Sequence, residues 1–166
     1  MGELKSINRR TFVKRSAFGA LSIPLISTNP LLAFPPKSIK LTILHTNDMH
    51  SHIDPFSAND SKYPGMGGMR KMASIVEKIR KEEDHVLLLD AGDIFQGTPY
   101  FNKYKGEVEL KIMSEMGYAA STMGNHDFDN GINGFNDVLP HASFPFLCSN
   151  YDFSNTVLDG KTKKFI

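Results

Sequence analysis

An unbroken apolar run, Val86-Leu87-Leu88-Leu89, follows a segment with helical periodicity at 69–83. Such runs are typical of strands that are covered on both faces, as in parallel sheets. β-prone runs also occur at 41–47 and 119–123, and a second helical pattern lies at 106–116. Alternation of strands and helices predicts an α/β fold with a parallel sheet. A further helix is expected over 132–139 and a fourth strand over 145–150.

Each of the first three expected strands runs into a short polar segment. These segments are Asp48-Met49-His50, Asp90-Ala91-Gly92-Asp93 and Gly124-Asn125-His126-Asp127. The carboxyl ends of parallel strands share one rim of the sheet, so the polar side chains are expected to meet there. Oxygen and imidazole donors suit Zn, Mn, Fe or Co rather than a thiolate site. The residues expected on this rim are Asp48, His50, Asp93, Asn125 and His126.

Taken singly, each segment has a more ordinary explanation. Gly, Asn and Asp are common turn residues, and Asp-x-His alone is a weak signal for a metal. His45 lies within the first expected strand, so we predict that it packs in the core. Asp90 is expected to belong to the strand end and to orient the loop that follows.

Composition narrows the class of protein. The 166 residues suffice for one domain, and the hydrophobic share of 40% is that of a globular chain. A single cysteine, Cys148, excludes an internal disulfide and a cysteine-rich metal cluster. The net charge of +1 gives no sign of a partner that is a nucleic-acid polymer.

Residues 1–36 are predicted to be an export signal and a linker. A basic segment at 8–14 precedes a broken apolar run at 17–34, which is typical of a secretory signal. The pair Arg9-Arg10, followed by Phe12 and Lys14, resembles the twin-arginine export signal. That resemblance implies the twin-arginine export machinery as a partner and a periplasmic or otherwise exported protein. A fortuitous basic start is the alternative, and both cleavage near Ala33 and an uncleaved anchor stay open.

The order and wording of the three polar segments resemble the calcineurin-like metallophosphoesterases. Leu44–His50, Asp90–Asp93 with Gln96–Pro99, and Met123–Asp129 are similar to the 5′-nucleotidase branch of that family. The similarity covers roughly residues 40–151. It implies that residues 37–166 form the N-terminal portion of an αββα sandwich.

The resemblance also implies a role for each matching residue. Asp48 and His50 would hold a first divalent metal, Asp93 would bridge two metals, and Asn125 would hold the second. His126 would stabilise charge at the phosphoryl group or assist the leaving oxygen, and Asp129 would orient its ring. A metal-bound hydroxide would be the nucleophile. Asp127 stands where the branch usually has Glu, and we expect it to contact groups behind the ligands.

The family completes its site with later histidines, but no histidine follows His141 here. The chain is therefore expected to be a truncated portion or half of a split protein, inactive alone, with a C-terminal domain on the same or a separate chain. The expected function is an exported two-metal phosphoesterase that hydrolyses nucleotides. Alternatives on the same fold are a thiosulfohydrolase of sulfur oxidation, a cyclic-nucleotide phosphodiesterase and a sugar-nucleotide hydrolase. A non-catalytic metal-binding homologue is the alternative from another class.

Overall fold

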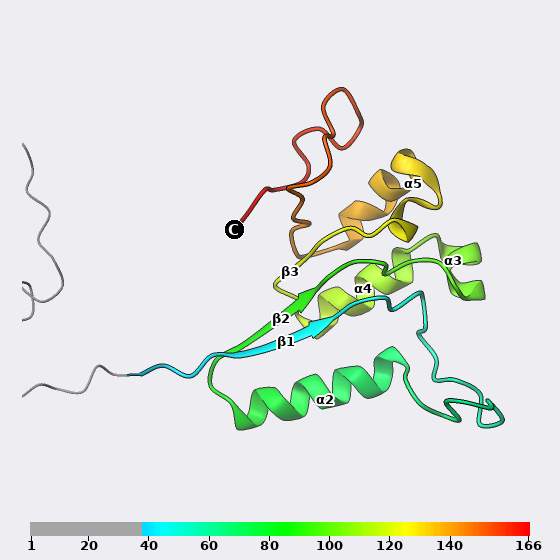
Figure 1. The fold of residues 1–166 in the computed structure, drawn as a ribbon, viewed down its shortest axis with the longest axis vertical. Coiled ribbons are helices and arrows are strands. Elements are labelled where there is room, and N and C mark those ends of the chain that lie inside the picture. Colours follow the sequence, from blue (N-terminus) through cyan, green and yellow to red (C-terminus); the bar gives the residue numbers. More distant parts are fainter. Residues whose placement is uncertain (1–37) are drawn as a thin grey trace, which may run out of the picture. The chain divides into compact units, whose positions relative to one another are not determined.

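The structure is a computed structural model that describes residues 38–166, so the predicted export signal lies outside the described residues. Three parallel strands form a sheet in the order β1 (Thr42–Thr46), β2 (Val86–Asp90) and β3 (Ala120–Ser121) (Figure 1). The register pairs Thr46 with Asp90 and Asp90 with Ser121. The three strands therefore end side by side, and the predicted parallel α/β sheet is confirmed.

Helices connect the strands near the positions that the periodicity predicts. They are α2 (Met69–Glu82), α4 (Glu107–Met116) and α5 (Gly131–Val138), and short 3₁₀ turns cover η1 (His126–Phe128) and η2 (Leu139–His141). A short helix that the sequence analysis missed is α3 (Pro99–Tyr104). Thr98 caps it by accepting a hydrogen bond from the Tyr100 N–H, and Pro99 occupies its first turn. This Thr-Pro pair is a recognisable helix-start signal.

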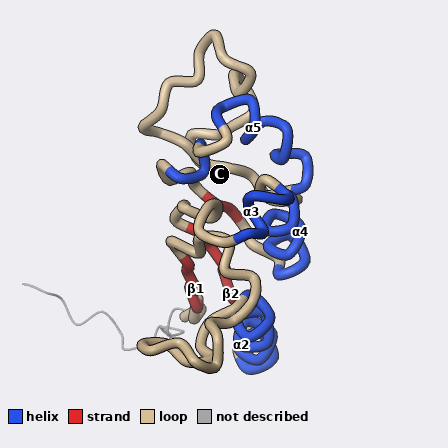
Figure 2. The backbone as a smooth tube through the Cα atoms, turned by 90° about the vertical axis from the view of Figure 1, so that its right-hand side faces the viewer, coloured by secondary structure: helices blue, strands red, loops and turns tan. Residues whose placement is uncertain are grey.

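The helices gather on one side of the strands (Figure 2). On that side Leu88 of β2 is buried in a core with Leu110 and Met113 of α4 and Phe135 of α5. Ile43 of β1 points the other way and is 57% exposed. His45 shares that exposed side of β1, so the prediction that His45 packs in the core is wrong. Strand side chains alternate between faces, and the described helices cover only one face.

The fourth strand that was expected at 145–150 is reduced to two isolated parallel bridges. One joins Ser121 to Phe146 and the other joins Leu147 to Lys163. Phe146 and Cys148 are nevertheless buried, as alternation along a strand would require. The apolar pattern of residues 145–150 therefore predicted correctly which side chains are buried. The prediction that these residues pair as a regular strand is wrong. None of the helices in residues 38–166 is long and apolar enough to cross a membrane.

Candidate metal centre

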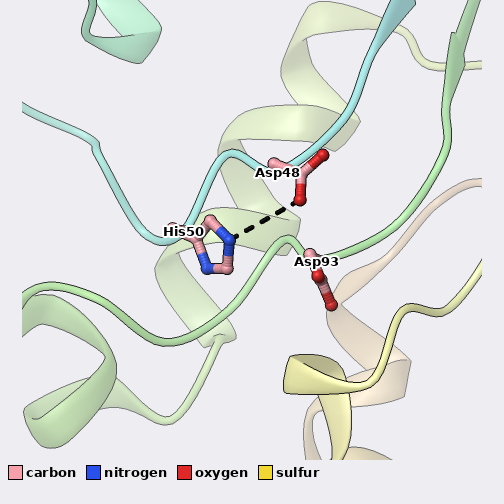
Figure 3. Close-up of side chains that lie close together, drawn as sticks. All are labelled: Asp48, His50 and Asp93. Carbon is pink, nitrogen blue, oxygen red and sulfur yellow. Dashed lines mark ion pairs between the residues drawn. The ribbon is translucent and has the colours of Figure 1, made fainter.

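The loops that follow β1 and β2 bring together Asp48, His50 and Asp93 (Figure 3). One ligand atom from each of these residues lies within 4.8 Å of those of the other two. The His50 Nε2 atom lies 3.7 Å from Asp48 Oδ1. Asn47, which the sequence analysis did not single out, donates an amide hydrogen bond to the Asp48 carboxylate. We call Asp48, His50 and Asp93 the triad.

All three triad residues have a left-handed backbone, with φ of 52° at Asp48, 46° at His50 and 55° at Asp93. Such conformations cost non-glycine residues roughly 1–3 kcal/mol each and cluster at functional sites. Hydrogen bonds between the two loops hold them in place. The Asp48 N–H donates to Gly92 O across 2.9 Å, and the His50 N–H donates to Asp93 O across 3.1 Å. The contact between β1 and β2 therefore continues past the strand ends into the site.

The loop after β3 closes onto Asp93. The His126 N–H donates to Asp93 Oδ1 across 2.9 Å. Gly124 lies so close that a Cβ there would stand 2.1 Å from the same oxygen, and a Cβ on Gly92 would stand 2.4 Å from Gly124 N. Only glycine permits this approach. The exposed Asn125 lies between these two contacts with Asp93.

His126 and Asp129 form a pair beside the triad. The Nδ1 atom of His126 lies 2.9 Å from Asp129 Oδ2, and its ring meets the His50 ring edge-on at a centroid distance of 5.2 Å. The hydrogen bond to Asp129 raises the pKa of His126 above its ordinary value, and the nearby carboxylates of Asp129, Asp93 and Asp127 add to the effect. The sequence-predicted dyad partners are thus in contact.

Asp127 ties two of the loops together from beneath. It is 1% exposed, and its Oδ1 atom accepts the N–H groups of Ile94 and Phe95 at 2.8 and 3.1 Å. Its Oδ2 atom accepts those of Asp93 and Gly124 at 3.0 and 2.8 Å. Burial raises the pKa of Asp127 to about 6, and these N–H groups oppose the shift. Asp127 is shorter than the Glu that is usual in the branch, but it still contacts groups behind the ligand residues, as we expected.

The carboxylates of the site lack a lysine or arginine partner in the part of the chain that the structure describes. Within residues 38–166, none of Asp48, Asp90, Asp93 and Asp127 forms an ion pair with lysine or arginine. Clustered carboxylates that repel one another favour a bound cation as counter-charge. The donors of the triad are oxygen and imidazole nitrogen, which divalent transition metals accept. The residues present therefore fit a divalent metal ion.

The strand ends of the parallel sheet carry, in chain order, Asp-x-His, Gly-Asp and Gly-Asn-His-Asp. The family model for the calcineurin-like phosphoesterases matches residues 41–165, and the chain belongs to this family. Its α/β fold matches the N-terminal calcineurin-like phosphoesterase domain of 5′-nucleotidases. The family is metal-dependent, in agreement with the donors of the triad.

Within this family, the chain is similar to several individual nucleotidases. The snake venom 5′-nucleotidase of Gloydius brevicauda is 45% identical over 117 residues, which are 68% of this chain and 20% of that protein. The structure of a 5′-nucleotidase precursor from Thermus thermophilus has a TM-score of 0.67 at 35% identity, covering 74% of this chain and 25% of that one. The NAD nucleotidase of Haemophilus influenzae has a TM-score of 0.66 at 32% identity, covering 74% and 23%. The chain spans about a fifth of the length of the curated relatives that it matches.

Proposed function

We propose that this chain carries the metal-binding part of an exported phosphoesterase that hydrolyses 5′-nucleotides. The observation that carries the proposal is the convergence of the triad beside the His126–Asp129 pair. Its curated relatives are 5′-nucleotidases, which supports nucleotides as the substrate class.

In this proposal Asp48 and His50 would hold one divalent ion, Asp93 would contribute to two ions, and Asn125 would hold the second. Ions bound there would supply positive charge at the phosphoryl oxygens and activate water for attack on phosphorus. The protein's own contribution is to fix the donors in place. The left-handed backbone at Asp48, His50 and Asp93 and the N–H of His126 supply that rigidity.

His126 acts on the reacting phosphoryl group. Its Nδ1 atom faces Asp129, which leaves Nε2 as the nitrogen directed to the substrate. The raised pKa of His126 favours the protonated ring, which stabilises negative charge and donates a proton to the leaving oxygen. Asp129 fixes the tautomer and the orientation of the ring.

We further propose that residues outside 38–166 complete the site. The triad offers three ligand atoms, fewer than two ions require. The longer relatives support additional ligands and nucleotide contacts from elsewhere, on the same or a separate polypeptide. Export through the twin-arginine route is proposed from Arg9, Arg10, Phe12 and Lys14, and the comparison with a venom protein supports an exported location.

The test is hydrolysis of candidate substrates by the complete polypeptide that carries these residues, with added Mn or Zn and with the products separated by chromatography. The substrates are a nucleoside 5′-monophosphate, a cyclic nucleotide, a sugar nucleotide and NAD, the last because of the NAD nucleotidase neighbour. The proposal predicts metal-dependent turnover of the 5′-monophosphate that Asp48→Asn abolishes. Turnover of the cyclic nucleotide alone would replace the proposed substrate class, and absence of turnover on every phosphoester would contradict the enzyme assignment.

A further inference from the structure

A buried polar network lies beneath the triad and is centred on Asp90, which is 6% exposed. Its carboxylate accepts three hydrogen bonds. The Thr46 hydroxyl donates to Oδ2 across 2.6 Å, and the Ser121 hydroxyl and the Gly92 N–H both donate to Oδ1 across 2.9 Å. These donors come from the end of β1, the end of β3 and the loop after β2. A single carboxylate thus joins all three strand ends from which the site loops leave.

Each partner in the network adjoins a segment that carries a ligand. Thr46 precedes Asp48 by two residues, and Gly92 directly precedes Asp93. The Thr46 hydroxyl donates to Asp90, so its oxygen is free to accept the Tyr118 O–H, 2.9 Å away. The Tyr118 oxygen lies 3.9 Å from Met49 Sδ, and Met49 stands between the first two triad residues. Displacement of this network would therefore move the loops of both Asp48 and Asp93.

The network is costly if its only task is to stabilise the fold. Burial raises the pKa of Asp90, and the three hydrogen bonds only oppose that effect. No lysine or arginine in residues 38–166 pairs with it. Even buried ion pairs can often be replaced by apolar residues of similar volume without loss of stability, and a buried charge without a counter-charge is more costly than a pair. A carboxylate with three donors from three strand ends instead gives the loops a defined spacing.

We propose that Asp90 is a positioning residue, which sets the spacing of the triad through Thr46, Gly92 and the Tyr118 hydroxyl. This inference rests on the proposed metal site. In this proposal Asp90 itself touches neither the metal nor the substrate. Residues of this kind behind metal ligands typically change metal affinity by about 10–100-fold when they are replaced.

The experiment measures the dissociation constant for Mn²⁺ by calorimetry, together with the unfolding temperature of each metal-free protein. Asp90→Asn is expected to weaken Mn²⁺ binding by about 10–100-fold at a temperature where the protein is folded. The matched control is Glu109→Gln, because Glu109 of α4 is 0% exposed and its carboxylate has no hydrogen-bond partner among the described residues. This control also replaces a buried carboxylate by an amide, and it should leave the Mn²⁺ dissociation constant unchanged.

An Asp90→Asn protein with a lower unfolding temperature but the wild-type dissociation constant would overturn the inference, because that pattern indicates a merely structural residue. If Asp90→Asn does not fold, the same measurement is made on the Thr46→Val variant. It removes one donor and the Tyr118 contact with little change in volume, and it is expected to weaken Mn²⁺ binding, whereas an unchanged constant would overturn the inference. Failure of the wild-type protein to bind Mn²⁺ would overturn the proposed metal site as well, which distinguishes the two failures.

Discussion

The main-chain N–H of His126 donates a hydrogen bond to the Asp93 carboxylate across 2.9 Å. This bond joins the loop after β3 to the triad residue that follows β2. One oxygen of Asp93 is therefore oriented by the protein itself, and Gly124 lies so close that a Cβ there would clash with that carboxylate. The third loop is part of the ligand geometry, although none of its residues belongs to the triad.

Replacement of Asp127 tests how these loops are held. In Asp127→Asn an NH₂ group replaces one oxygen, so either orientation of the amide leaves two of the four main-chain N–H groups without an acceptor. Each unsatisfied buried donor costs about 1–3 kcal/mol. We expect the free energy of unfolding in urea at pH 8 to fall by about 2–6 kcal/mol. The exposed substitution Asp137→Asn is the control, and a loss no larger than in that control would contradict the role of Asp127.

The His126–Asp129 pair predicts a pH dependence. In metal-free protein the pKa of His126 should exceed its ordinary value of 6.5, because Asp129 stabilises the charged ring. The contribution of the pair to stability is then full below pH 6.5 and is lost as the pH rises through the elevated pKa. Titration of the ring by NMR should show a lower pKa in Asp129→Asn. The control Asp84→Asn, at the opposite end of β2, should leave the His126 titration unchanged, and an Asp129→Asn titration that matches the wild type would refute the pairing.

Turnover tests the chemical role of the same pair. Removal of a positioned acid or base typically costs about 10²–10⁴ in rate. We expect His126→Asn in the complete polypeptide to lower kcat by that order, with metal content nearly unchanged. Asp129→Asn should cost less, because it only orients the ring. An Asp129→Asn protein with the wild-type kcat would contradict the orienting role of Asp129.

The strands, the three longer helices and the position of the polar segments follow from the sequence, because they depend on local periodicity and, after the second and third strands, on Gly92 and Gly124. The contact between His126 and Asp129 was expected from the resemblance to the 5′-nucleotidase branch, and the two side chains do lie in contact. The left-handed backbone of the triad does not follow from the sequence, because non-glycine residues adopt it uncommonly and it accompanies hydrogen bonds between loops that are distant in sequence.

Two expectations failed for tertiary reasons. His45 was expected in the core because β1 is apolar, but the described helices cover only the other face of the sheet. Residues 145–150 have a strand-like pattern, but Ser121 and Lys163 give them only single bridges. The hydrogen bonds of Asp127 were not foreseen in detail, because the four N–H groups come from segments that are distant in sequence or bent by glycine.

Export tests the interpretation of residues 1–36. Changing both Arg9 and Arg10 to lysine keeps the charge, so a general basic signal would survive the change. We expect the double variant to remain in the cytoplasm when cell fractions are compared by immunoblot. Export of the variant at the wild-type level would contradict the twin-arginine assignment.

The most direct test of the central claim is anomalous X-ray diffraction from crystals of the Mn²⁺-loaded protein. We expect a manganese peak in contact with Asp48, His50 and Asp93, and its loss in Asp93→Asn crystals grown under the same conditions. Manganese bound elsewhere, with no peak at the triad of the wild-type protein, would contradict the account.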